Sequence, residues 1–286
     1  MSDVKAGSGS LRVILLTAIA MVAFAANSLL CRLALQQLAV DAASFASIRL
    51  VSGALMLAII MRLMPSKATP ARPDWLAAAM LFVYVACFSF AYLSLSAGTG
   101  ALILFGAVQV TMFTAGLRAG EVFDRVAWVG LILAVAGLIY LVLPGVTAPP
   151  LLGAGLMAIA GVAWGGYSLR GRGLPNPLAV TAGNFLRATP MAVALSVLLL
   201  SQSHVTPIGI ALAIASGALT SGVGYVIWYA ALSGLTAMRA ATVQLSVPPL
   251  AAFGGVLLLS EAITLRLALA SVAILGGIAL VLIRRT

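Results

Sequence analysis

The sequence is poor in charged residues, and this scarcity excludes a water-soluble protein. Only 8% of its 286 residues are Asp, Glu, Lys or Arg, whereas 63% are hydrophobic. Soluble domains carry about 25% charged residues, which they need to cover a surface that faces water. We therefore predict a membrane protein.

Acids and histidine are scarcest, and their positions exclude several kinds of chemistry. The chain has one histidine, His204, in a loop, and six acids in the tail, in loops or at predicted helix ends: Asp3, Asp41, Asp74, Glu121, Asp124 and Glu261. A proton relay requires an intramembrane Asp, Glu or His, and an enzyme requires an acid–base pair, an activated nucleophile or a metal cluster. We predict no enzyme, no cofactor, no metal and no strict proton coupling.

Cysteine is almost absent, which excludes a disulfide framework. Cys31 and Cys87 fall in predicted helices or at their ends, and we expect both to be free apolar thiols.

Ten long apolar segments make up most of the chain. About 20 apolar residues cross about 30 Å of hydrocarbon as a helix, and the alternation of a membrane β-barrel is missing. The predicted helices are 11–31, 42–62, 75–97, 100–117, 126–143, 150–168, 179–200, 208–231, 236–258 and 264–283.

Basic residues predict how these helices are oriented. Outside the helices, one side holds twelve Lys and Arg residues and the other holds two, Arg32 and Arg266. Because cytoplasmic loops are enriched in Lys and Arg, we predict a multi-pass inner-membrane protein with both termini in the cytoplasm. The +10 net charge thus reflects topology, and we expect no nucleic-acid partner.

An internal repeat divides the chain into two halves. "AIAMVAFAANSL" (18–29) matches "AIAGVAWGGYSL" (158–169) at seven of twelve positions, and the same offset of 140 residues relates Phe45 to Phe185 and Gly137 to Gly277. The units 1–145 and 146–286 would each hold five helices. Since five is odd, the second unit would enter the membrane inverted. We predict an all-α integral membrane protein, with ten transmembrane helices as two inverted five-helix repeats, a design of carriers that bind substrate between the repeats.

Several local motifs resemble the drug/metabolite transporter superfamily, EamA type. They are Gly120–Glu121 and Ser260–Glu261, "FASIR" at 45–49 and "YAALSGLTAMRAATVQLSVPPLAA" at 229–252. The resemblance covers the whole chain, and aromatic amino acid exporters of the YddG type are the leading match within it. It implies a central cavity lined by the first, third, fourth, sixth, eighth and ninth helices, with the fifth and tenth at the periphery.

Aromatic and amide side chains within these helices are the candidate substrate-binding residues. They are Phe24, Asn27, Tyr84, Phe88, Tyr92, Gln109, Trp164, Tyr167, Tyr225, Trp228 and Gln244. The alternatives are plain packing, interfacial anchoring of the aromatic rings and amides that join neighbouring helices. Pro248 and Pro249 would interrupt the ninth helix, either as a hinge or as a tolerated kink.

Four charged residues have structural and functional interpretations. Arg49 and Arg187 could each hold a substrate carboxylate, but we expect them to snorkel to the membrane surface. Glu121 and Glu261 directly precede the fifth and tenth helices, where we expect them to stabilise the helix N-terminus.

The predicted cavity is neutral, polar and aromatic, which favours a zwitterionic cargo. The leading hypothesis is an inner-membrane exporter of amino acids, including aromatic ones, or of similar small metabolites, which acts as a monomer in the lipid bilayer. The alternatives are an exporter of drugs, nucleosides or sugars, and a structural membrane protein without transport activity.

Overall fold

The chain is almost entirely helical in the computed structural model, which describes residues 2–64, 74–118, 120, 125–145, 148–171, 176–232 and 243–283. The first half contains α1 (Ser2–Gln36), α2 (Ala42–Leu63), α3 (Trp75–Ala91), α4 (Ala97–Arg118) and α5 (Arg125–Val142). The second half contains α6 (Leu151–Gly171), α7 (Pro177–Leu198), the short η1 (Leu200–Gln202), the continuous run α8 (Pro207–Ile214), η2 (Ala215–Val223) and α9 (Gly224–Leu232), then α11 (Val247–Leu259) and α12 (Leu265–Ile283).

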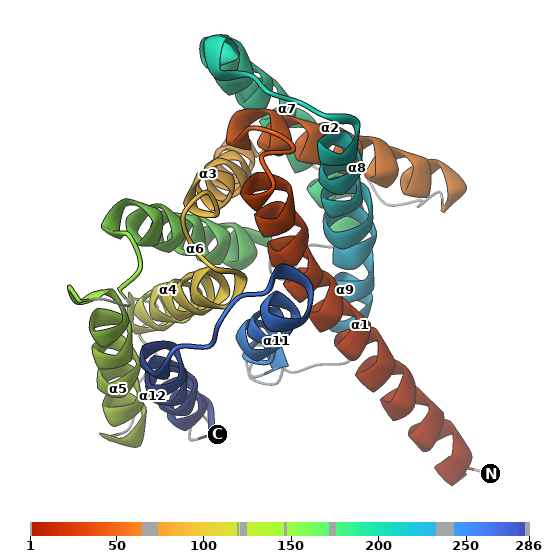
Figure 1. Ribbon diagram of the computed structural model, residues 1–286. Helices are drawn as coiled ribbons and strands as arrows, with labels where there is room; N and C mark the ends of the chain where they lie inside the picture. The colour runs from red at the N-terminus through yellow and green to blue at the C-terminus, as the bar shows by residue number, and fades with distance from the viewer. Residues whose placement is uncertain are drawn as a thin grey trace.

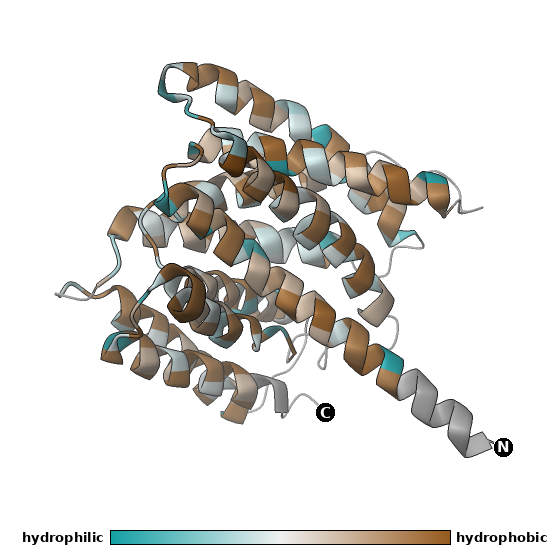
Figure 2. Cartoon of the chain, turned by 45° about the vertical axis from the view of Figure 1, so that its right-hand side comes forward, coloured by the Kyte–Doolittle hydropathy of each residue, from teal (hydrophilic) through white to brown (hydrophobic). Residues whose placement is uncertain are grey.

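The described helices have the length and composition of membrane spans. Seven are long and apolar enough to cross a bilayer, and three shorter apolar helices, Trp75–Ala91, Val247–Leu259 and Leu265–Leu280, accompany them. Hydrophobic residues dominate the helices, and hydrophilic ones gather mainly towards the loops (Figure 2). The prediction of an all-α membrane protein is confirmed.

Two predicted helix boundaries are wrong. The third helix ends at Ala91, not at residue 97, and α4 begins at Ala97. Tyr92 follows α3 as its C-terminal cap, so residues 92–96, "YLSLS", form the connection between the two helices. Hydropathy alone placed the boundary too late, because Tyr92, Leu93 and Leu95 continue the apolar pattern of α3.

The start of the predicted ninth helix, 236–258, lies outside the described residues, but an interruption within it is described. Val243 and Gln244 are helical, a turn follows at 245–246, and α11 starts at Val247 with Pro248 and Pro249 in its first turn. A proline there removes no helical hydrogen bond, since the first N–H groups of a helix have no intrahelical acceptor. Residues 233–242 lie outside the described ranges.

Helices of the first half pack mainly against helices of the second. α1 packs on α9, η2 and α11, α2 on α7 and η2, α3 on α6 and α7, α4 on α6 and α11, and α5 on α12. Figure 1 shows α5 and α12 side by side at one edge of the bundle, away from α2 and α7. The centre of the bundle is therefore walled by both halves.

Polar contacts link several loops at one end of the bundle. We call this the α1–α2 end, because the connection between α1 and α2 lies there, and we call the opposite end the α2–α3 end. Val40 and Val205 form an isolated antiparallel bridge. The Asp41 carboxylate caps α2 through the Ser44 N–H at 2.9 Å and accepts the His204 N–H at 3.0 Å. The loop after α1 is thereby joined to the loop before α8.

The contact between α2 and η2 depends on Gly217. A Cβ atom at this position would collide with the Arg49 carbonyl oxygen and with Ser52 Oγ. Only glycine lets the two backbones approach this closely, as small residues do at many membrane helix contacts.

We predict that Gly217→Ala destabilises the protein by roughly 1–3 kcal/mol, because overpacking forces α2 and η2 apart. The measurement is the thermal midpoint of the purified protein in detergent. Gly276→Ala in α12 is the matched control, since its added Cβ meets nothing within 4 Å; equal effects of both substitutions would contradict the account.

Candidate functional site

A central pocket lies between the two halves and is lined by five of the six helices predicted to form it. It encloses about 350 Å³ of empty space, including the part open to its surroundings. Its walls come from α1, α3, α4, α6 and the run η2–α9; α11 does not contribute. The lining residues are Phe24, Asn27, Ser28, Tyr84, Phe88, Leu104, Phe105, Trp164, Thr220, Ser221 and Tyr225.

An aromatic cluster narrows this pocket. The Phe24 ring lies edge-on to Trp164, Tyr225 and Trp228, with centroids 6.4, 6.0 and 5.8 Å away. Trp164 also lies 4.9 Å from Tyr84 and 5.2 Å from Tyr225. The rings leave space for only about one or two water molecules, so a metabolite can enter only if they move apart.

Asn27 connects this aromatic cluster to a row of hydroxyl groups on η2. Its Oδ1 atom accepts a hydrogen bond from Ser216 Oγ at 2.6 Å and lies 3.3 Å from Thr220 Oγ1, whose hydroxyl donates mainly to the Ser216 carbonyl oxygen at 2.7 Å. Its Nδ2 atom donates to Tyr84 Oη at 3.5 Å. The amide is thus held between α3 and η2, in the pocket wall.

The hydroxyl row exists because η2 is a nine-residue π-helix, Ala215–Val223. The wider π turn brings residues four and five apart onto one face, so that Ser216, Thr220 and Ser221 all point towards α1 and α2. π-Helical segments are rare and occur often at functional sites. The composition "ASGALTSGV" contains small residues throughout, but no sequence pattern predicted this conformation.

Arg49 lies inside the bundle, so the prediction that it snorkels to the membrane surface is wrong. It is 1% exposed. Its Nε donates to Ser221 Oγ at 3.2 Å and its Nη2 to Tyr84 Oη at 3.1 Å. The guanidinium carbon also lies 5.2 and 5.0 Å from the ring centroids of Tyr84 and Phe88. Three pocket-lining residues, Tyr84, Phe88 and Ser221, therefore hold a positive charge behind the pocket wall. The described lining itself contains no charged side chain, in agreement with the predicted neutral cavity, but the prediction did not include the charge of Arg49 next to it.

Arg187, for which we also predicted snorkelling, has different surroundings. It is partly exposed on α7, and its guanidinium lies along its own helix beside Gly183. Arg187 therefore remains compatible with snorkelling, whereas Arg49 faces inward because Gly217 draws η2 against its side of α2.

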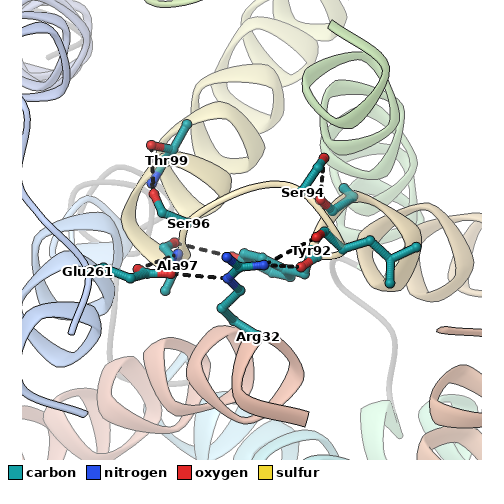
Figure 3. Close-up of polar contacts among 9 residues, drawn as sticks. Arg32, Tyr92, Ser94, Ser96, Ala97, Thr99 and Glu261 are labelled. Carbon is teal, nitrogen blue, oxygen red and sulfur yellow. Dashed lines mark hydrogen bonds and ion pairs between the residues drawn. The ribbon is translucent and has the colours of Figure 1, made fainter. Parts of the chain in front are cut away.

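Arg32 and Glu261 form an ion pair at the α1–α2 end of the bundle (Figure 3). Their Nε and Oε1 atoms are 3.2 Å apart, and both side chains are mostly buried. Glu261 Oε2 accepts the Ala97 N–H at 2.8 Å, and Arg32 Nη1 donates to the Tyr92 carbonyl oxygen at 2.9 Å. The pair thus ties α1, the α3–α4 connection and the α11–α12 loop together.

The prediction for Glu261 names the wrong helix. The carboxylate does stabilise a helix N-terminus, but this is the N-terminus of α4 and not that of the following helix. α12 is capped instead by Thr264, whose Oγ1 accepts the Leu267 N–H at 3.1 Å. Glu121, its counterpart in the repeat, lies outside the described residues.

A second pocket, the end pocket, opens towards the α2–α3 end. Its lining comprises Asp74, Ala77, Tyr167, Arg170, Gly171, Pro177, Val180, Asn184 and Tyr229. Arg170 and Asp74 form an ion pair at 2.9 Å. Partial burial raises the pKa of Asp74, but hydrogen bonds from the Ala77 N–H and Arg170 outweigh it and lower that pKa overall. The Tyr167 ring lies 5.6 Å from Trp164, so these two rings separate the end pocket from the central one.

The predicted binding residues thus fall into three groups. Six of the eleven line the central pocket: Phe24, Asn27, Tyr84, Phe88, Trp164 and Tyr225. Tyr167 lines the end pocket. Four line neither pocket: Tyr92, Gln109, Trp228 and Gln244.

The four residues outside both pockets have other surroundings. Trp228 packs behind Phe24, and the Tyr92 hydroxyl donates to the Ala97 carbonyl oxygen at 3.3 Å. Gln109 Nε2 is buried and has no hydrogen-bond partner among the described residues, and Gln244 is buried.

Comparisons with known proteins agree with this architecture. The model of the EamA-like transporter family matches residues 151–283. A relative from Pseudomonas aeruginosa, the uncharacterized protein PA1977, is 57% identical to this chain over 274 aligned residues. The alignment covers 96% of each of the two chains. The chain belongs to the EamA-like transporter family.

A solved crystal structure shares the fold of this family member. The two chains superpose with a TM-score of 0.68 at 16% sequence identity, over 94% of this chain and 96% of the other. Family membership makes the chain a membrane transporter of small metabolites, and the central pocket is its candidate binding site.

We predict that the Arg32–Glu261 pair contributes more to stability than the Arg170–Asp74 pair, whose side chains are 44% and 30% exposed against 16% and 11%. Exposed ion pairs contribute about 0–1 kcal/mol, whereas we expect a coupling free energy of about 1–2 kcal/mol for the buried pair. Double-mutant cycles with alanine, read from unfolding in detergent, measure both. A larger coupling for Arg170–Asp74 would show that the α1–α2 end is not the tighter closure.

Proposed function

We propose that this chain carries small metabolites by alternating access, and that its cargo includes amino acids, aromatic ones among them. The observation that carries the proposal is a polar and aromatic pocket at the centre of the bundle, walled by both halves. Its rings suit a cargo with an aromatic or apolar body, and its amide, hydroxyl and guanidinium groups suit the polar part of a small metabolite.

The pattern of helix packing supports two inverted five-helix repeats, 1–145 and 146–286. Exchanging each helix for its counterpart in the other half leaves the pairs α2–α7, α4–α11 and α5–α12 unchanged, and it converts the contact of α1 with η2–α9 into that of α6 with α3. A pseudo-two-fold axis produces this pattern. Rocking one repeat against the other would then open the central pocket to one side at a time.

The two closures at the ends support the same mechanism. At the α1–α2 end the closure is the Arg32–Glu261 pair. Towards the α2–α3 end it is the layer of Trp164 and Tyr167 between the two pockets. An alternating carrier requires two barriers that open in turn, and these differ in chemistry, one ionic and one aromatic.

The charge distribution supports an orientation and an uncoupled mechanism. With twelve basic residues on the side of the α2–α3 end, both termini are cytoplasmic in an inner membrane, and a single chain forms the whole pathway. None of the acids whose side chains are described lines the central pocket. Transport therefore needs no proton gradient, and export follows the concentration gradient of the cargo.

Two alternatives remain as outcomes of the experiment. A carrier of drugs, nucleosides or sugars would use the same pocket and pathway. A structural membrane protein would produce no flux at all.

We expect purified protein in liposomes to exchange radiolabelled amino acids in a counterflow assay without a pH gradient. A panel that includes phenylalanine, leucine, a nucleoside and a sugar distinguishes the cargo classes. If only the nucleoside or the sugar is transported, the chain is a carrier of that class of cargo and not of amino acids. If nothing is transported, a structural membrane protein is favoured.

We also predict that a disulfide between Gly98→Cys and Ala252→Cys stops this flux and that reduction restores it. A Cβ atom at Gly98 would lie 2.7 Å from Ala252 Cβ, where α4 and α11 meet; since the Cβ atoms of a disulfide lie about 3.5–4.5 Å apart, the two helices must separate slightly for the bond to form. The control pair, Gly137→Cys and Ala273→Cys, joins α5 to α12 at a similar distance of 2.9 Å, but at the edge of the bundle. Both cysteine pairs are introduced into a variant in which the native Cys31 and Cys87 have been replaced. Unchanged flux with the first pair oxidised would contradict alternating access.

A further inference from the structure

Arg49 is a buried cation to which no described carboxylate binds. Its Nη1 atom is buried and has no hydrogen-bond partner among the described residues. The acids with described side chains are engaged elsewhere: Asp41 with Ser44 and His204, Asp74 with Arg170, and Glu261 with Arg32. A charged group inside a membrane protein is costly unless it is paired, and it marks a functional site more often than a structural one.

The hydrogen bonds around Arg49 leave donors without acceptors. Tyr84 Oη accepts hydrogen bonds from Arg49 Nη2 and Asn27 Nδ2, and Ser221 Oγ accepts one from Arg49 Nε. A hydroxyl that only accepts still has its own proton to donate. No described residue receives a hydrogen bond from either hydroxyl. Three donors, on Arg49, Tyr84 and Ser221, therefore lack an acceptor, and two of these residues line the central pocket.

The same site offers little to a cation. Among the described side chains of the pocket lining only Asn27 carries a carbonyl oxygen, and Ser216 Oγ already donates to it at 2.6 Å. An ammonium group would meet the fixed charge of Arg49 and could bind only to aromatic faces. A carboxylate has two oxygens with about four lone-pair directions, which match the three donors and neutralise the guanidinium.

We infer that the cargo binds through a carboxylate held by Arg49, Tyr84 and Ser221, and that an ammonium group on the cargo is dispensable. The inference rests on the proposed carrier function and names the chemical class of its cargo: small monocarboxylates with an aromatic or apolar body. The body packs against Phe24 and Trp164. A zwitterionic amino acid binds too, but it leaves the positive charge of the site uncompensated, whereas a simple carboxylate does not.

Binding to the purified full chain in detergent, measured by calorimetry, tests the inference with four probes of the same shape. These are 3-phenylpropionate, phenylalanine, phenethylamine and 3-phenylpropanol. We expect the two carboxylates to bind, 3-phenylpropionate at least as tightly as phenylalanine. The amine and the alcohol should bind at least about 10-fold more weakly, since charge-assisted hydrogen bonds to the carboxylate are lost.

Variants identify the residues responsible. Arg49→Gln should weaken 3-phenylpropionate binding about 10- to 100-fold and leave phenethylamine no weaker. Tyr84→Phe removes one hydrogen-bond donor without changing the charge of the site, and it should weaken 3-phenylpropionate binding less than Arg49→Gln does. Arg187→Gln, in the other intramembrane arginine, should have no effect. If Arg49→Gln does not fold, Tyr84→Phe and Arg49→Lys test the inference in the same assay. Both should still weaken the binding of the two carboxylates and leave the binding of phenethylamine and 3-phenylpropanol unchanged.

The outcomes separate this inference from the proposed function. Any of three results would overturn the inference. Phenethylamine could bind as tightly as 3-phenylpropionate, neither carboxylate could bind, or the Arg49 and Tyr84 variants could bind the carboxylates as tightly as the unaltered protein does. Carboxylate binding that depends on Arg49 without any flux in liposomes would leave the site intact and refute the carrier. Flux of an amine or a sugar that is insensitive to Arg49→Gln would leave the carrier intact and refute the carboxylate site.

Discussion

A guanidinium buried in the middle of a membrane bundle is the constraint on which the rest of this structure depends. Removing such a charge from water costs several kcal/mol even after relaxation. The chain meets this cost with two neutral hydrogen bonds and two aromatic faces. Gly217 draws η2 against α2, and the π turn supplies Ser221 where an ordinary helix would not. Packing, backbone conformation and pocket chemistry thus all converge on Arg49.

In the proposed carrier, the contacts at the two ends of the bundle are the barriers that open in turn. The Arg32–Glu261 pair and the Ala97 N–H that Glu261 caps join the two halves at the α1–α2 end. Trp164 and Tyr167, which separate the two pockets, both lie on α6, and Trp164 meets the first half at Tyr84. A movement of one half against the other would therefore change both sets of contacts. A carboxylate that neutralises Arg49 would change the electrostatic free energy of the pocket, and the bundle can couple this change to its closure.

Much of the fold was predictable from the sequence because a lipid solvent imposes simple rules. Apolar length predicts the membrane-spanning helices, whereas the correspondence of helices in a repeat of 140 residues stays a prediction that the pattern of helix packing supports. Six aromatic and amide residues of the pocket followed from their positions inside helices. Features that depend on distant partners were not predictable. Arg49 and Ser221 are 172 residues apart, and Glu261 caps a helix that begins 164 residues before it. No local sequence pattern indicates whether an arginine faces lipid or packs against a distant helix that a glycine allows to approach. Arg49 was therefore expected to snorkel. Likewise, the end of α3 is hidden in an apolar run, and the π-helix has no known local signal.

The most direct test of the account is a structure of the protein with 3-phenylpropionate bound. We expect the two carboxylate oxygens within about 3 Å of Arg49 Nη1 and Tyr84 Oη, with the phenyl ring against Trp164 and the aromatic cluster opened around it. A probe bound elsewhere in the bundle, or a carboxylate of the protein itself bound to Arg49, would contradict the central claim.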